Sequence, residues 1–106
     1  LLRWAVSNAG HESLELLART HLARVLMAGN KLDEALQLVA QQDDKVFAAR
    51  FAEIRGDIYR QQGKMDQARD AYQSALADST LTGKAREFIE MKLQNLPAAA
   101  TMEDQN

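Results

Sequence analysis

The sequence contains no cysteine, and this absence excludes several kinds of chemistry. Without thiols the chain has no disulfide framework, no thiolate zinc site and no cysteine nucleophile. The 106 residues include one proline and five glycines, and aromatic residues make up only 6%. The glycines are scattered along the chain, so the sequence has no phosphate-binding loop. A chain of this length fits one small domain with a modest core.

A charge excess of one sign is also missing. The chain has 13 basic and 15 acidic residues, which gives a net charge of −2 at pH 7. Nucleic-acid binding normally needs a basic excess to replace counterions, so we expect no nucleic-acid partner. No apolar run approaches the ~20 residues that span a bilayer, and no signal peptide is visible. Because the sequence starts at Leu1 rather than at Met, we interpret it as part of a longer protein.

Candidate catalytic and metal-binding residues are few. The two histidines, His11 and His21, are ten positions apart and do not share a helix face at ligand spacing. No third ligand is evident, so we expect no metal site and no cofactor. Ser13, His21 and Asp33 include the residue types of a Ser-His-Asp triad, but nothing marks a nucleophile turn or an oxyanion hole. We therefore expect a binding function and no enzymatic activity.

What the sequence does contain is an internal repeat with a period of 33 positions. The recurring pairs are Ala23 and Gly56, Leu26 and Tyr59, Ala35 and Ala68, and Val39 and Tyr72. A fixed period near this length is typical of stacked helical hairpins, which bury apolar faces on one another and usually present docking surfaces. Antiparallel helices pack with their axes ~8–10 Å apart, so we expect the small residues to lie where the helices cross.

Apolar residues at three- and four-residue spacing predict helices throughout, and no segment alternates with the period of a strand. The predicted helices cover residues 12–28, 32–40, 46–62, 65–77 and 83–96. In the first of these helices we predict one buried stripe, formed by Leu14, Leu17, Ala18, Leu22, Val25 and Leu26.

Turn residues punctuate this pattern. Gly29 and Asn30 close the first helix, since both tolerate the left-handed cap conformation, and Gly63 ends the third. Thr82 is the predicted N-cap of the last helix, and Pro97 stops that helix.

The repeat resembles the tetratricopeptide repeat. The second copy carries the characteristic residues Gly56, Tyr59, Ala68, Tyr72 and Ala75, whereas the first copy is degenerate. The resemblance implies an all-α fold of tetratricopeptide-like hairpins, stacked as a short right-handed superhelix with a C-terminal capping helix. We assign residues 1–97 to this domain and 98–106 to a disordered tail. Within the domain we distinguish the end of a preceding repeat (1–9), repeat 1 (12–42), repeat 2 (46–79) and the capping helix (82–96).

A narrower resemblance covers roughly residues 1–97. Residues 51–57, 63–69 and 91–97 are similar to the C-terminal half of the YfgM-like family, the ancillary subunits of the SecYEG translocon. The segment from Leu17 through Leu36 and the preceding Trp4 also look like that family. The ending Met-Lys-Leu-x-Asn-Leu, which begins at Met91, is the most specific part, because nothing in a generic repeat requires it.

This resemblance implies a function as well as a fold. It implies a non-enzymatic interaction domain at the periplasmic face of the bacterial inner membrane, in a protein held there by an anchor that is absent from this sequence. The implied partners are translocon subunits and periplasmic chaperones. Two alternatives stay open: a soluble repeat adaptor or assembly factor for another envelope complex, and a regulatory module fused to an enzyme.

In tetratricopeptide-like hairpins the first helix of each pair lines the concave face. The outward positions of these helices are predicted to be Leu17, Thr20, Arg24, Met27, Arg50, Glu53, Asp57 and Arg60. These residues form either a solvated face with helical charge pairs such as Asp57 with Arg60, or a mixed-charge groove that binds an extended segment or a helix.

Two further kinds of contact depend on the positions of the asparagines and on the apolar residues at the start of the chain. The carboxylate clamp of chaperone-binding repeats needs asparagines inside first helices, and Asn8, Asn30, Asn95 and Asn106 lie elsewhere. At the chain's start, Leu1, Leu2 and Trp4 are either the cut edge of a larger core or exposed residues through which homo-oligomers form.

Overall fold

The computed structural model describes residues 11–40 and 47–97. Over these ranges the chain forms five helices and no strand. They are α2 (His11–Ala28), α3 (Leu32–Ala40), α4 (Ala48–Gln61), α5 (Met65–Leu76) and α6 (Gly83–Gln94). The all-α prediction is confirmed, and each helix end lies within two residues of its predicted position. The predicted preceding repeat at 1–9, the linker at 41–46 and the tail at 98–106 fall outside the described residues.

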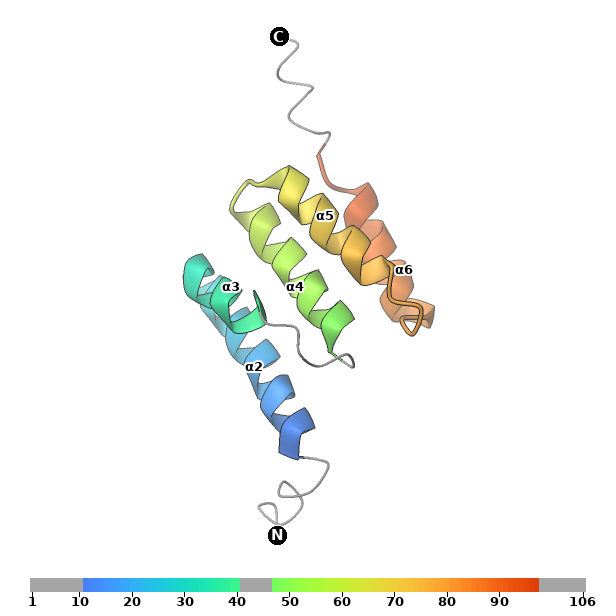
Figure 1. Ribbon diagram of the computed structural model, residues 1–106. Helices are drawn as coiled ribbons and strands as arrows, with labels where there is room; N and C mark the ends of the chain where they lie inside the picture. The colour runs from blue at the N-terminus through green and yellow to red at the C-terminus, as the bar shows by residue number, and fades with distance from the viewer. Residues whose placement is uncertain (1–10, 41–46, 98–106) are drawn as a thin grey trace.

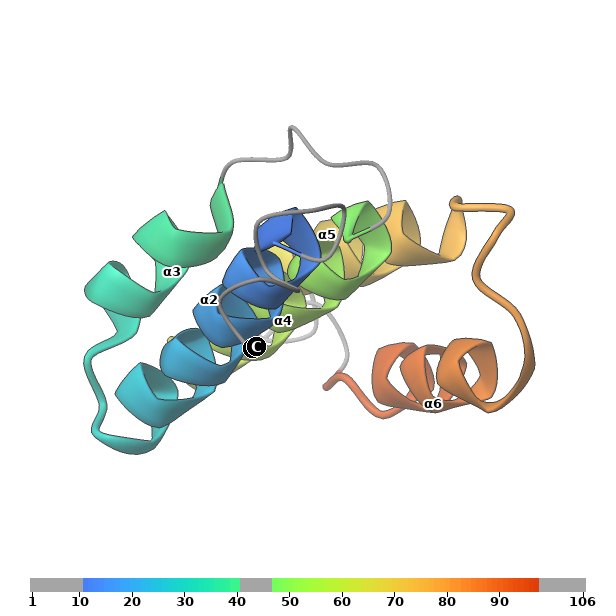
Figure 2. The ribbon, with the colours of Figure 1, turned by 90° about the horizontal axis from the view of Figure 1, so that it is seen from below.

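The helices follow one another as antiparallel hairpins. α2 pairs with α3, α4 pairs with α5, and α6 returns along α5 (Figure 1). Seen from below, α3 and α5 lie toward one side and α6 toward the other, with α2 and α4 between them (Figure 2). α2 and α4, which are the first helices of the two hairpins, can therefore form a common surface together with α6.

Both hairpins close with the same turn. Asn30 and Gly63, which lie 33 positions apart, have the left-handed φ angles of 64° and 83°. In each turn the next amide reaches back five residues to a carbonyl, the hydrogen bond of a Schellman motif. These amide–carbonyl pairs are Lys31 with Leu26 and Lys64 with Tyr59, each at 2.8 Å. The predicted left-handed closure is confirmed at Asn30, and Gly29 is not among the described residues with positive φ. Gly63 ends its helix as predicted, and it does so in the same left-handed conformation.

Gly56 lies in the middle of α4 for a steric reason. A Cβ atom at this position would lie 2.4 Å from a ring carbon of Tyr72, far inside van der Waals contact. The Tyr72 side chain on α5 is fully buried, so its ring occupies the place that a larger residue would need. In the first hairpin the equivalent residues, Ala23 and Val39, are also fully buried. The prediction that small residues lie at the crossings is confirmed.

Two apolar clusters hold the hairpins together, and α4 contributes to both. The first cluster joins the two hairpins and contains Leu16, Ala23, Ala35, Val39, Phe51, Ile54 and Ile58. The second joins the second hairpin to α6 and contains Ala49, Ala52, Ala68, Tyr72, Ala75, Ile89 and Leu96. α4 is therefore the central helix of the described structure.

The predicted buried stripe of α2 is wrong at most of its positions. Leu14, Leu17, Leu22 and Val25 are between 43% and 52% exposed. The buried positions of this helix are Leu16, Thr20 and Ala23. The reason is that apolar residues occur all around α2, whereas α3 and α4 cover one side of it in the described structure.

α6 is tied to the end of the second hairpin. Arg86 of α6 donates a hydrogen bond from Nη1 to the carbonyl of Leu76 at 3.0 Å. Thr82 occupies the predicted N-cap position with an extended backbone, at φ −137° and ψ 174°, although its side chain makes no capping hydrogen bond. Ile89 and Leu96 anchor the inner side of the helix in the second cluster.

Candidate binding groove

Three adjoining hollows lie along α2, α4 and α6, and together we call them the inner groove. The apolar hollow, of about 560 Å³, lies between α2 and α4 and contains Leu17 and Ile54. The polar hollow, of about 550 Å³, is lined by residues of α2, α4 and α6, among them Asp57 and Lys92. The cap hollow, of about 410 Å³, lies between α4 and the start of α6. Arg24 lines all three hollows, which makes the groove continuous.

Each of the eight residues predicted for the concave face lines at least one hollow. They are Leu17, Thr20, Arg24, Met27, Arg50, Glu53, Asp57 and Arg60. The structure thus brings them to one surface, and a binding role for them stays a prediction.

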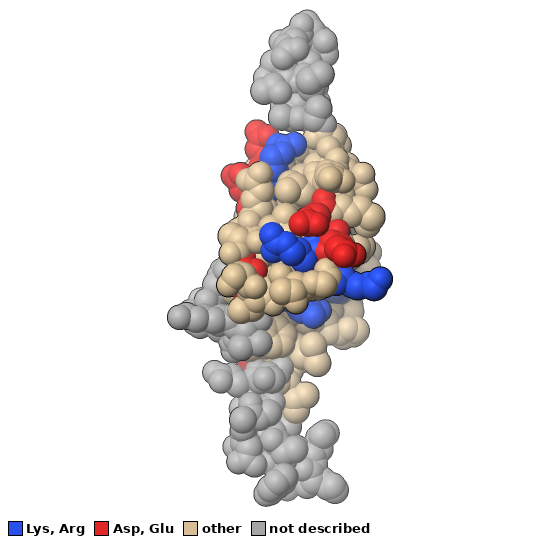
Figure 3. Space-filling model, turned by 90° about the vertical axis from the view of Figure 1, so that its right-hand side faces the viewer, with Lys and Arg blue, Asp and Glu red and all other residues tan. Residues whose placement is uncertain are grey.

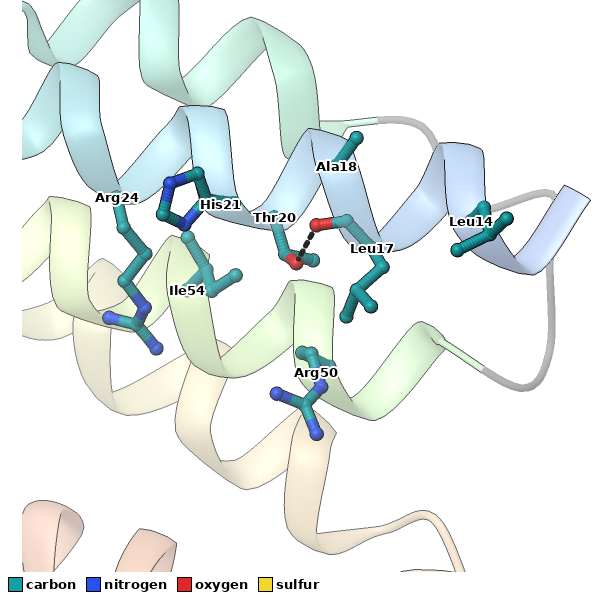
Figure 4. Close-up of a pocket in the computed structure, with 8 residues that line it drawn as sticks. All are labelled: Leu14, Leu17, Ala18, Thr20, His21, Arg24, Arg50 and Ile54. Carbon is teal, nitrogen blue, oxygen red and sulfur yellow. Dashed lines mark hydrogen bonds between the residues drawn. The ribbon is translucent and has the colours of Figure 1, made fainter. Parts of the chain in front are cut away.

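One of these residues is not outward as predicted. Thr20 is only 6% exposed, and its hydroxyl donates to the Leu17 carbonyl at 2.7 Å (Figure 4). This residue faces the packed side of α2, where the neighbouring hairpin covers it. It therefore lies at the floor of the apolar hollow and has no free hydroxyl to offer a ligand.

Asp57 is the centre of the groove's ionic network. Lys92 of α6 donates from Nζ to both carboxylate oxygens of Asp57, at 3.0 and 3.1 Å. Arg24 of α2 donates from Nη1 to Asp57 Oδ2 at 2.7 Å. The predicted pair of Asp57 with Arg60 is not among the ion pairs of the described residues. Asp57 is directed across the groove toward the neighbouring helices, so it pairs between helices and not along α4.

The network extends behind and beside Asp57. The buried hydroxyl of Tyr72 donates to Asp57 Oδ1 from α5. Burial, together with this hydrogen bond, raises the pKa of Tyr72 well above its usual value, so the phenol is a hydrogen-bond donor at neutral pH. Lys92 also donates to Glu53 Oε2 at 2.8 Å. One carboxylate thus joins side chains from α2, α5 and α6.

Sequence reasoning missed Lys92 and Tyr72 as members of this network. No spacing rule relates α6 to α4, so Lys92 gave no signal. A signal did exist for the third partner: Arg24 and Asp57 lie 33 positions apart and carry opposite charges. Equivalent positions of stacked hairpins are neighbours in space, and here they form an ion pair.

The apolar hollow has a different character. Leu14, Leu17, Ala18 and Ile54 supply its apolar lining, and among the described residues the charged side chains that line it are Arg24 and Arg50 (Figure 4). His21 is exposed and also lines this hollow. The hollow can therefore accept an apolar side chain beside a negative charge.

The described residues show no grouping suited to a metal ion, since no three His, Cys, Asp or Glu side chains come together. None of the described helices has the length and apolar character needed to cross a membrane. Acidic and basic side chains are interspersed on the face shown in Figure 3, without a broad area of one sign.

Antiparallel helical hairpins that repeat every 33 positions and share a groove along their first helices define a helical-repeat protein. The sequence confirms this class: the chain belongs to the tetratricopeptide repeat-like domain family, whose profile matches residues 1–98. No solved structure gives a significant match to the chain.

Two relatives carry the same printed name. The ancillary SecYEG translocon subunit of Neisseria gonorrhoeae is 33% identical over 95 residues, and that of Escherichia coli K12 is 27% identical over 95 residues. Each match covers 90% of this chain and 46% of the relative, so the chain spans about half the length of these proteins. The resemblance to ancillary translocon subunits is confirmed, and family and relatives together support a role in protein–protein interaction.

Proposed function

We propose that this chain is a non-enzymatic interaction domain of an envelope protein that associates with the Sec translocon. The observation that carries the proposal is its similarity, across 90% of the chain, to two ancillary SecYEG translocon subunits. The structure supplies a means of association, because the inner groove runs along α2, α4 and α6.

The same proposal includes a location and further partners. The domain lies at the periplasmic face of the bacterial inner membrane, in a protein held there by a membrane anchor, and it also contacts periplasmic chaperones. Support for this part is the family resemblance alone. Proteolysis of spheroplasts tests it: a periplasmic domain is digested while the inner membrane is intact, whereas protection of the domain contradicts the location.

The partner assignment is tested by site-specific cross-linking in the organism that encodes the protein. A photo-reactive amino acid replaces Leu17, in the apolar hollow, or Ser74, which is exposed on α5 outside the inner groove. Each variant is produced from the intact gene, irradiated, purified through an affinity tag and analysed by mass spectrometry.

We expect translocon subunits or periplasmic chaperones to be cross-linked from position 17 and much less from position 74. The Ser74 variant is the matched control, because it carries the same reactive group on the other helix of a hairpin. Capture of neither class of partner from either position, with both variants folded and normally abundant, would contradict the association. Capture from position 74 alone would assign the contact to a surface outside the groove.

A further inference from the structure

The carboxylates that line the inner groove are all engaged within the protein. Glu53 and Asp57 share Lys92. Asp78, in the cap hollow, accepts hydrogen bonds from the hydroxyl and the backbone N–H of Thr80 at 2.7 and 2.9 Å. These hydrogen bonds hold the pKa of Asp78 below its usual value. Glu53 and Asp57, which are already paired with a cation, attract a further one only weakly, whereas Asp78, bonded to a neutral residue, keeps its negative charge in the cap hollow.

The arginines of the groove are less satisfied. Arg50 lines the apolar and cap hollows, Arg60 lines the polar hollow, and both are exposed. Neither has an ion-pair or hydrogen-bond partner in the described part of the chain. Arg24 donates to Asp57 through Nη1 alone. The described lining of the groove has four basic side chains (Arg24, Arg50, Arg60 and Lys92) and three acidic ones (Glu53, Asp57 and Asp78), so its balance is positive, although the whole chain has a net charge of −2.

Apolar surface lies directly beside these guanidinium groups. Leu14 and Leu17 are 43% and 51% exposed in the apolar hollow, and Ile54 is buried there (Figure 4). A purely acidic ligand would leave this apolar surface in water, and a purely apolar one would leave the arginines unpaired. A ligand that combines both features satisfies both parts of the hollow.

We propose that the inner groove binds protein segments in which acidic residues stand next to bulky apolar residues. An apolar side chain enters the apolar hollow, and neighbouring carboxylates meet Arg50 and the free side of Arg24. A further acidic residue along the segment reaches Arg60. This inference rests on the proposed function, because it assigns a chemistry to the same groove.

Synthetic peptides test the chemistry directly. The first probe is a fluorescently labelled peptide in which Leu alternates with Glu and Asp. In a second peptide each acidic residue is replaced by Lys, and in a third each Leu is replaced by Ser. Binding to the purified domain is measured by fluorescence anisotropy. We expect the first peptide to bind about tenfold or more tightly than either of the others, and its affinity to fall as salt is added.

The protein variants separate the groove from the overall charge. Arg50→Glu combined with Arg60→Glu should weaken binding of the first peptide by about tenfold or more. Lys64→Glu combined with Lys84→Glu changes the net charge equally, at exposed positions outside the three hollows, and should leave binding within about twofold. Circular dichroism checks that both variants keep their helices. Equal losses in the two variants overturn the proposal.

Other results of the peptide experiment also decide whether the proposal stands. Failure of the first peptide to bind at millimolar concentration overturns the proposal, as does preference for the Lys peptide. The chain's own residues 98–106 include Met102, Glu103 and Asp104, which have the proposed chemistry. Acidic peptides that bind only after removal of 98–106 would show that the groove serves the chain itself, and would overturn a partner's role.

The two proposals fail independently. Cross-linking of translocon subunits at Leu17, without any charge preference among the peptides, removes the acidic–apolar chemistry and leaves the translocon assignment standing. A clear preference for the acidic–apolar peptide, without capture of translocon subunits or chaperones, removes the translocon assignment and leaves the acidic–apolar chemistry standing.

Discussion

The two hairpins share a turn and a crossing geometry, yet they differ in how they use one stripe of residues. Ala18 and Val25 of α2 correspond, after 33 positions, to Phe51 and Ile58 of α4. Phe51 is 1% exposed and Ile58 is fully buried, because both pack against the first hairpin. Val25 is 52% exposed, and no described helix covers it. A repeat therefore shows which positions are equivalent, and the neighbour on each side decides which of them are buried.

A polar position in the same stripe supports this conclusion. Arg55 of α4 donates from Nη1 to the carbonyl of Val39 at 3.0 Å, which ties α4 to the end of α3. Burial lowers the pKa of Arg55 from its usual value. The equivalent residue of α2 is Leu22, which is 47% exposed and has no group that could donate such a hydrogen bond.

The test with the largest expected effect removes one large apolar side chain from α4 and one from α2. Phe51→Ala leaves a cavity in the first cluster and should lower the free energy of unfolding by about 3–5 kcal/mol. Leu22→Ala on α2 removes a side chain that is already half in water, so a change within about 0.5 kcal/mol is expected. Urea unfolding followed by circular dichroism measures both. Equal losses would show that α2 is as well covered as α4.

A second test concerns the crossing residues. Gly56→Ala forces a methyl group into the Tyr72 ring and should cost about 1–3 kcal/mol. At Gly29, whose added Cβ would meet atoms no closer than 3.7 Å, the same substitution meets no such obstacle. The first hairpin predicts how the cost can be removed, because there Ala23 is opposite Val39.

Gly56→Ala should therefore cease to destabilise when Tyr72→Val is already present, and a gain of up to about 1 kcal/mol from the better helix former is expected in that background. The double-mutant cycle is read from urea midpoints. A cost that is the same in both backgrounds would contradict the steric explanation.

The test with the smallest expected effect compares Lys92 and Arg24, the two cationic side chains that pair with Asp57. Lys92→Met strips the shared partner from Glu53 and Asp57, which are only 15% and 12% exposed, and should cost about 1–2 kcal/mol. Arg24→Met removes a side chain that is 45% exposed and should cost less than about 1 kcal/mol. Thermal unfolding at low and high salt measures both. A larger loss from Arg24→Met would show that Arg24 of α2, and not Lys92 of α6, is the more important partner of Asp57.

Much of the fold could be predicted from the sequence because its signals are local. Helix spacing, the turn residues Asn30 and Gly63, and the small residues at the crossings each reflect the conformation or packing of one hairpin. The exposed stripe of α2 could not be predicted, since apolar residues on all sides of a helix do not say which side is covered. For the same reason, Thr20 was expected to be outward and is buried.

The candidate site was predictable in outline and not in its connections. The repeat assigned the lining residues of α2 and α4 to one face, because equivalent positions share an orientation. The partners of Asp57 could not be predicted, because they depend on how α6 returns across α4. Only Arg24 had a signal, through its opposite charge at the equivalent position.

Membership of α4 in both apolar clusters also bears on how the domain opens. Neither hairpin can separate from the rest without exposing residues of α4 such as Phe51 or Ala52 to water. The amides of α4 should therefore exchange with deuterium only in the rarest, global openings, while those of α2 exchange through smaller ones. In this short array, cooperativity spreads outward from a single shared helix.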